Sequence, residues 1–142
     1  MSKTIAQIEN EIVEEFSFFD NWEEKYEYII DFGKNLKPMD AQYKTDENKV
    51  AGCVSQVWLH SDLKNGAVTF EADSDAIITK GLVGLLVKVL SGQKPADVAN
   101  AELAFIDKIG MKEHLSPTRS NGLVNMIKHM KRAAAAYAAN NN

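Results

Sequence analysis

Residues 77–90, IITKGLVGLLVKVL, place apolar side chains on almost every face of a helix. A helix of this kind needs cover on all sides, so the other segments must surround it. Lys80 and Lys88 interrupt the segment, which is well short of the ~20 apolar residues that cross a bilayer, so we expect a central buried helix and no membrane span. A chain of 142 residues supports one hydrophobic core, which predicts a single domain over residues 1–142.

Two glycines inside this segment, Gly81 and Gly84, indicate a close neighbour. Each costs about 1 kcal/mol of helix propensity relative to alanine, so something must approach the helix closely at these positions. We expect that neighbour to be the backbone of a sheet. The polar residues at 73–75 are predicted to cap the start of the helix, and Ser-Gly at 91–92 to end it.

Asn65-Gly66 separates two segments rich in β-branched and aromatic residues, 57–60 and 67–71. This arrangement is typical of a β-hairpin with a tight turn near Asn65-Gly66. Residues 49–53 are expected to add a short extra strand. The predicted sheet is therefore small and antiparallel.

Apolar residues recur at helical spacing in two segments before the hairpin. Thr4 followed by Gln7 is the signature of a capping box at the start of the first helix, and Asp20 followed by Glu23 repeats it for the second. Gly33 and Pro38 are expected to end the second helix.

Further helices are predicted after the central one. Pro95 fits the first turn of a short helix, residues 103–109 form another, and Ser116-Pro117 begins the last. We expect the tail of the last helix, from about residue 138 to residue 142, to fray into disorder. Strands joined by a hairpin and surrounded by helices indicate an α+β fold, with a small antiparallel sheet packed against helices.

The distribution of charge argues against nucleic-acid binding. The net charge is −4, and most aromatic residues lie in the acidic first third of the chain, whereas nucleic-acid binders usually show a basic domain with interleaved aromatics. Residues 111–142 carry five basic residues against one glutamate. These charges are either solvated helix faces or, less simply, a surface that docks a partner.

Cysteine use indicates the compartment. One cysteine cannot form an intramolecular disulfide, and residues 1–12 are charged where a signal peptide would need an apolar core. We therefore expect a reducing compartment, most simply the cytoplasm.

The lone thiol, Cys53, lies in the segment VAGCVSQVWL, after a glycine and before a predicted strand. A single cysteine at such a place is either a small buried hydrophobe or a reactive thiol. Thiolate chemistry needs a sulfur that a partner can reach, a backbone that allows close approach, and stabilisation of the anion. Gly52 supplies the second, whereas Lys49 is the one local residue that could supply the third.

Other chemistries find less support in the sequence. A Cys/His hydrolase would need a base beside the sulfur, and His60, His114 and His129 qualify by residue type alone. The histidines and the thiol lack the spacing of zinc ligands, and a single thiolate cannot hold an iron–sulfur cluster by itself. No phosphate-binding loop is present, so we expect neither a metal nor a bound cofactor.

Arg119 is a second candidate, in the run LSPTRSNGL at residues 115–123. It lies in the first turn of the predicted last helix, where its charge opposes the helix dipole. Such a position indicates a functional site or a carboxylate of a partner. The alternatives are a salt bridge to Asp73 or Asp75 and a simply exposed arginine.

Four motifs together resemble one family. These are the G-C-x-S-x-V-W pattern at residues 52–58, DSDA at 73–76, Lys80-Gly81, and LSPTRSNGL at 115–123. Over roughly residues 8–137 the chain is similar to the SufE-type sulfur acceptors, the SufE and CsdE cysteine desulfuration proteins. The resemblance implies an α+β fold like that of the IscU-type cluster scaffolds.

The resemblance also implies a function. Cys53 would accept persulfide sulfur from a PLP-dependent cysteine desulfurase of the SufS or CsdA type, stimulate that enzyme, and pass the sulfur to a scaffold for iron–sulfur cluster assembly. The PLP belongs to the partner, so the chain would be an accessory protein rather than an enzyme. Gly52, Asp75 and Arg119 would shape the cysteine loop or dock the partner, and a lowered pKa at Cys53 would help both attack and retention.

Two alternatives to this function stay open. The first is an autonomous thiol enzyme that pairs Cys53 with His60 or His114. The second is a non-catalytic adaptor that regulates a desulfurase by docking alone.

Overall fold

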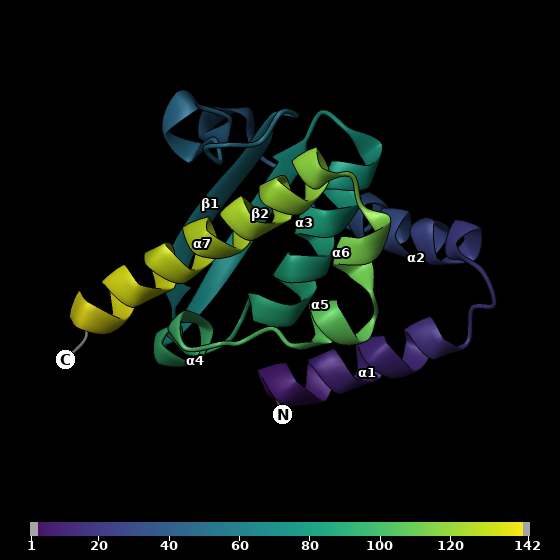
Figure 1. The fold of residues 1–142 in the computed structure, drawn as a ribbon. Coiled ribbons are helices and arrows are strands. Elements are labelled where there is room, and N and C mark those ends of the chain that lie inside the picture. Colours follow the sequence, from purple (N-terminus) through teal and green to yellow (C-terminus); the bar gives the residue numbers. More distant parts are fainter. Residues whose placement is uncertain (1–2, 141–142) are drawn as a thin grey trace.

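A computed structural model describes residues 3–140 of the chain and shows an α+β fold, as expected (Figure 1). The helices are α1 Ile5–Ser17, α2 Trp22–Lys34, α3 Ile77–Leu90, α4 Pro95–Ala99, α5 Phe105–Lys108, α6 Met111–His114 and α7 Pro117–Asn140. The strands are β1 Val57–Lys64 and β2 Ala67–Ser74, and two 3₁₀ turns, η1 Ala41–Tyr43 and η2 Asp46–Asn48, precede them.

The hairpin is confirmed, with β1 and β2 antiparallel in the register that pairs Val57 with Ser74. Asn65 and Gly66 form its turn with φ values of 53° and 81°, a left-handed geometry that favours asparagine and glycine. The extra strand expected at residues 49–53 is wrong, because one isolated bridge from Lys49 to Trp58 is all that forms there. The chain then leaves the sheet in a turn.

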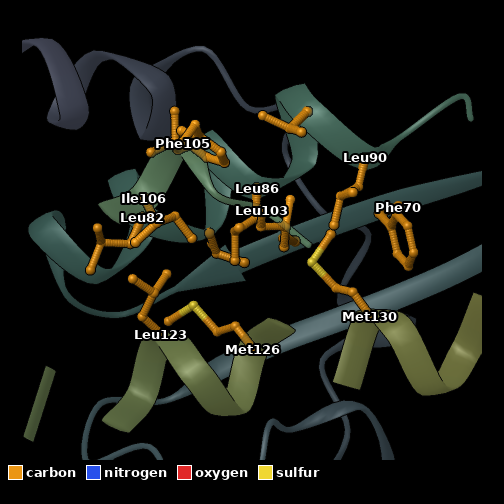
Figure 2. Packing of buried hydrophobic residues seen from close by; sticks show 14 of the residues in the cluster. Phe70, Leu82, Leu86, Leu90, Leu103, Phe105, Ile106, Leu123, Met126 and Met130 are labelled. Atoms are coloured by element: carbon orange, nitrogen blue, oxygen red, sulfur yellow. The ribbon is translucent and has the colours of Figure 1, made fainter. Parts of the chain in front are cut away.

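The buried position of α3 is confirmed. It contacts α2 on one side and β2, α1 and α7 on others, and Val83, Leu86 and Leu90 are fully buried. In Figure 1, α7 lies along the hairpin with α3 behind it. Figure 2 shows residues of α7 packed against α3, β2 and the segment before α5. The labelled side chains there are Phe70, Leu82, Leu86, Leu90, Leu103, Phe105, Ile106, Leu123, Met126 and Met130.

Helix α2, not the sheet, is the close neighbour of the glycines in α3. A Cβ atom on Gly81 would lie 2.5 Å from the Ile29 carbonyl oxygen, and one on Gly84 would lie 2.6 Å from that of Phe32. Gly33 contributes from the other side, where a Cβ would lie 2.8 Å from the Gly81 nitrogen. Helix α2 ends at Lys34, between Gly33 and Pro38 as expected, but Gly33 itself lies inside the helix, where it permits backbone-to-backbone packing.

The capping predictions are partly confirmed. Thr4 and Gln7 form the capping box of α1, but Asn21, rather than Asp20, caps α2 by accepting the Glu24 N–H at 2.9 Å. The polar residues at 73–75 do not cap α3, because β2 continues through Ser74 and Ala76 occupies the N-cap position without a side-chain bond.

The C-terminal helices follow the predicted order. Pro95 begins α4, α5 lies within residues 103–109, and α7 begins at Pro117. Helix α7 continues to Asn140, and residues 141–142 of the expected disordered tail lie outside the described residues. Among residues 3–140, no helix combines the length and the apolar character that a membrane span requires.

Candidate functional site

Cys53 lies in a turn at residues 51–56, here called the cysteine loop, which connects the Lys49–Trp58 bridge to β1. The loop packs near the N-terminal ends of α3 and α7, and the three segments enclose a cavity of about 330 Å³. Cys53, Val54 and Ser55 line it from the loop. Helix α3 contributes Thr79 and Leu82, and the α7 side contributes Ser116, Thr118, Arg119, Gly122 and Met126.

The thiol is half-buried at the edge of this cavity. Its S–H donates a hydrogen bond to the Gly122 carbonyl oxygen, with Sγ 3.6 Å from that oxygen. Burial raises the pKa of Cys53 above its ordinary value. The lowered pKa that would help attack and retention is therefore not present in the free protein, and Lys49, the local candidate for stabilising the anion, pairs with Asp46.

Gly52 gives the loop its shape through left-handed backbone, with φ of 81°. Its carbonyl oxygen accepts a hydrogen bond from the Asn125 side-chain nitrogen at 3.3 Å. A Cβ atom at Gly52 would lie 2.3 Å from that nitrogen. Glycine therefore serves both the turn and the close approach of α7, which holds the loop through Asn125 on one side of Cys53 and through Gly122 on the other.

Asp75 fixes the far end of the cysteine loop. Its carboxylate accepts the Gln56 N–H at 3.0 Å, and its own N–H donates to the Gln56 carbonyl at 3.2 Å. Asp75 does not line the cavity. It therefore acts on Cys53 only through the backbone that carries the sulfur.

Arg119 is exposed and lines the cavity that Cys53 lines. Among residues 3–140 it forms no ion pair with Asp73, which instead pairs with Lys44 at 2.6 Å and Lys80 at 3.3 Å. Burial acts to raise the pKa of Asp73, but hydrogen bonds from Lys44, a backbone N–H and Lys80 outweigh it and hold this pKa below its ordinary value. The guanidinium is thus available to an anion in the cavity or to a partner.

The structure brings no histidine of the described residues to the cavity wall. His60 stacks on Tyr43 with ring centroids 3.8 Å apart, and His114 stacks on Trp22 at 3.7 Å. His129 is half-buried on α7, and burial lowers its pKa. Two of the rings are held by aromatic neighbours and no histidine of residues 3–140 lines the cavity, so the described site lacks the base that a Cys/His hydrolase needs.

Two residues of the site were not predicted, Asn125 and Thr79. Asn125 follows Gly122 by three residues, so both lie on the same face of α7. Thr79 carries the one hydroxyl of a helix whose buried side chains are otherwise apolar or glycine. These were the available signals, but neither reveals that the loop packs there. Among the described residues, no cluster of three or more His, Cys, Asp or Glu side chains could hold a metal ion.

Comparison with known proteins places this site in a family of accessory sulfur-transfer proteins. The SufE family model, described as an Fe-S metabolism associated domain, matches residues 10–134, and the chain belongs to this family. Its role is therefore sulfur transfer linked to iron–sulfur metabolism.

The relatives agree with this assignment. An uncharacterised SufE-like protein of Rhizobium meliloti is 43% identical over 130 residues, which cover 88% of this chain and 93% of that protein. The chloroplastic/mitochondrial SufE-like protein 1 of Arabidopsis thaliana is 46% identical over 125 residues, 87% of this chain but 34% of the plant protein. A hypothetical protein of Thermus thermophilus, solved in solution, shares the fold with a TM-score of 0.78 at 19% identity, covering 93% of this chain and 96% of that one.

Proposed function

We propose that Cys53 takes persulfide sulfur from a cysteine desulfurase and passes it on for iron–sulfur cluster assembly. The observation that carries the proposal is the placement of the chain's one thiol at the edge of a cavity that also holds Arg119. Membership of the SufE family supports the same role. A carrier of this kind needs its thiol free between cycles, so we place it in a reducing compartment such as the cytoplasm.

The transfer is a thiol exchange without net oxidation. The Cys53 thiolate attacks the terminal sulfur of the donor persulfide, the S–S bond of the donor breaks, and a new S–S bond forms at Cys53. The donor cysteine leaves as a thiolate and takes up the proton that Cys53 gave up, so atoms and charge balance. The desulfurase supplies the PLP chemistry that makes its own persulfide.

The free protein holds Cys53 in a state that resists this reaction. The thiol is protonated by preference and hydrogen-bonded to Gly122. The attack therefore requires the loop to leave Gly122, so that the sulfur can ionise and reach the donor. Gly52, within the loop, and Asp75, which bonds Gln56 at the far end of the loop, are proposed to set how readily it moves.

The surface around the cavity suits a docking partner. Val54, next to Cys53, is 83% exposed, and Ile77, at the start of α3, is 70% exposed. Arg119 adds a charge without an ion-pair partner among residues 3–140. We assign this surface to the desulfurase, of the SufS or CsdA type, whose turnover the protein would stimulate by removing sulfur.

Intact mass measurement tests the proposal. The protein is incubated with a cysteine desulfurase and cysteine, and each persulfide sulfur should add ~32 Da. Cys53→Ser is the control and should gain nothing. An unchanged mass of the wild-type protein, or an adduct that persists in Cys53→Ser, would overturn the assignment of Cys53.

Desulfurase turnover separates the proposal from docking alone. If the protein is a sulfur carrier, the Cys53→Ser variant still binds the desulfurase but no longer accelerates its turnover, because the sulfur has no acceptor. An adaptor that works only by docking predicts full acceleration by the same variant. The two outcomes differ in one assay with one matched pair of proteins.

A further inference from the structure

The wall of the Cys53 cavity contains one polar side chain with an unusual position, that of Thr79. Thr79 is 7% exposed and is the one buried polar residue among residues 3–140. Every other buried side chain of α3 is apolar or glycine. A buried hydroxyl without a hydrogen-bond partner lowers stability unless a group in the adjoining cavity bonds it.

The Thr79 hydroxyl has no hydrogen-bond partner within residues 3–140. Thr79 lies in the first turn of α3, whose N-cap is Ala76, so it has no helical carbonyl four residues earlier to which its hydroxyl could donate. The hydroxyl is also not sealed in the core, because Trp58 Nε1 is the one fully enclosed side-chain polar atom without a partner in the described chain. Thr79 is one of the residues that line the cavity together with Cys53.

We propose that Thr79 donates a hydrogen bond to the terminal sulfur of the Cys53 persulfide and holds it in the cavity as an anion. The inference rests on the proposed function. Cys53 Sγ already lies against the Gly122 carbonyl oxygen, and the terminal sulfur lies about 2.05 Å beyond Sγ. The persulfide has no S–H on Sγ to offer to Gly122, so the sulfur chain turns into the cavity that Thr79 and Arg119 line.

The other walls of the cavity suit a sulfur atom. Leu82 and Met126 give it an apolar side, and Figure 2 shows these two side chains in the space between α3 and α7. The apolar wall shields one side of the terminal sulfur, while one hydroxyl and one guanidinium on the open side supply the polar contacts that its negative charge requires. Ionisation of the persulfide releases its proton to water, and no bond to sulfur changes in this step other than the loss of that proton.

Two variants isolate the hydroxyl. Thr79→Val keeps the shape of the side chain and removes the oxygen, and Thr79→Ser keeps the oxygen and removes the methyl group. Because the hydroxyl lacks a partner in the free protein, Thr79→Val should fold at least as stably as the wild type. Cys53 Sγ forms no hydrogen bond with Thr79, so alkylation of the unloaded thiol should be unaffected.

The test follows the pH dependence of alkylation of the loaded protein. Each variant is loaded with desulfurase and cysteine, freed of the enzyme, and treated with iodoacetamide across a pH series, and intact mass separates alkylated persulfide from alkylated thiol. Loss of one hydrogen bond to a charged sulfur should raise the midpoint for the persulfide by about one pH unit in Thr79→Val. Thr79→Ser should behave as the wild type.

The outcomes distinguish the inference from the function on which it rests. Normal loading with the same persulfide midpoint in Thr79→Val and the wild type would overturn the role of Thr79 alone. A midpoint raised equally in Thr79→Ser, which keeps the hydroxyl, would show that loss of the hydroxyl is not the cause and would also overturn the inference. A wild-type protein that takes up no sulfur would remove the proposed function, and the inference with it.

Discussion

Replacing Gly52 with alanine should release the cysteine loop from α7. An alanine at φ of 81° costs about 1–2 kcal/mol in the left-handed region. The new Cβ would also lie 2.3 Å from the Asn125 side-chain nitrogen, so Asn125 must swing away and give up its bond to the Gly52 carbonyl oxygen, a further ~1 kcal/mol. The total, about 2–3 kcal/mol, acts against the docked loop.

Gly66→Ala is the matched control. Gly66 has the same φ of 81° but no atom within 4 Å of its added Cβ, so it should lose only the backbone part, about 1–2 kcal/mol. The reduced entropy of the unfolded chain is the same for both substitutions and cancels in the comparison. Adding Asn125→Ala to Gly52→Ala removes the collision but does not restore the lost hydrogen bond.

Two measurements on the same variants report the effect. Cys53 is the one cysteine of the chain, so the rate of its modification by a thiol reagent at fixed pH measures how often the loop opens. We expect at least a tenfold faster rate in Gly52→Ala, and a rate near that of the wild type in Gly66→Ala, because about 1.4 kcal/mol corresponds to a tenfold change in opening. Urea unfolding gives the free energy of global unfolding of each variant. Equal modification rates in the two variants would refute the contact between Asn125 and the loop.

Three further predictions follow from other contacts. Gly81→Ala should lower the free energy of unfolding by about 2 kcal/mol, because overpacking against the Ile29 carbonyl outweighs the gain of ~1 kcal/mol in helix propensity. Urea unfolding measures this change, and a stabilised variant would contradict the packing of α2 on α3. Asp75→Ala should speed modification of Cys53, whereas Asp75→Asn, which keeps an acceptor oxygen for Gln56, should not. Because burial raises the pKa of Cys53, modification of this thiol should reach its half-maximum at a higher pH in the folded protein than in urea, and coincident midpoints would contradict the burial. The free energy of unfolding should be constant below the ordinary thiol pKa of about 8.5 and should fall as the pH rises above it, and Cys53→Ser should lack that fall.

The hairpin and the central helix could be predicted from the sequence because their signals are local. Asn65-Gly66 fixes a turn by the backbone it allows, and an apolar segment such as 77–90 has no stable place except the core. Gly81 and Gly84 indicated close packing correctly, but a glycine reports only that something approaches. It carries no information on whether a strand or a helix does so, and the neighbour proved to be α2.

The site illustrates the same limit. Cys53, Gly52 and Arg119 could be singled out by residue type and motif, and the structure places all three around one cavity or its loop. The role of Asn125 depends on contact between residues 73 positions apart. The raised pKa of Cys53 likewise depends on burial against α7, which no local pattern encodes.

Handover of sulfur tests the central claim most directly. Protein loaded by a desulfurase and then freed of it is mixed with a cluster scaffold, and the intact masses of both proteins are followed in time. A sulfur carrier predicts that this chain loses ~32 Da while the scaffold gains the same mass, and that Cys53→Ser transfers nothing. A loaded protein that keeps its adduct in the presence of the scaffold would contradict carriage through Cys53.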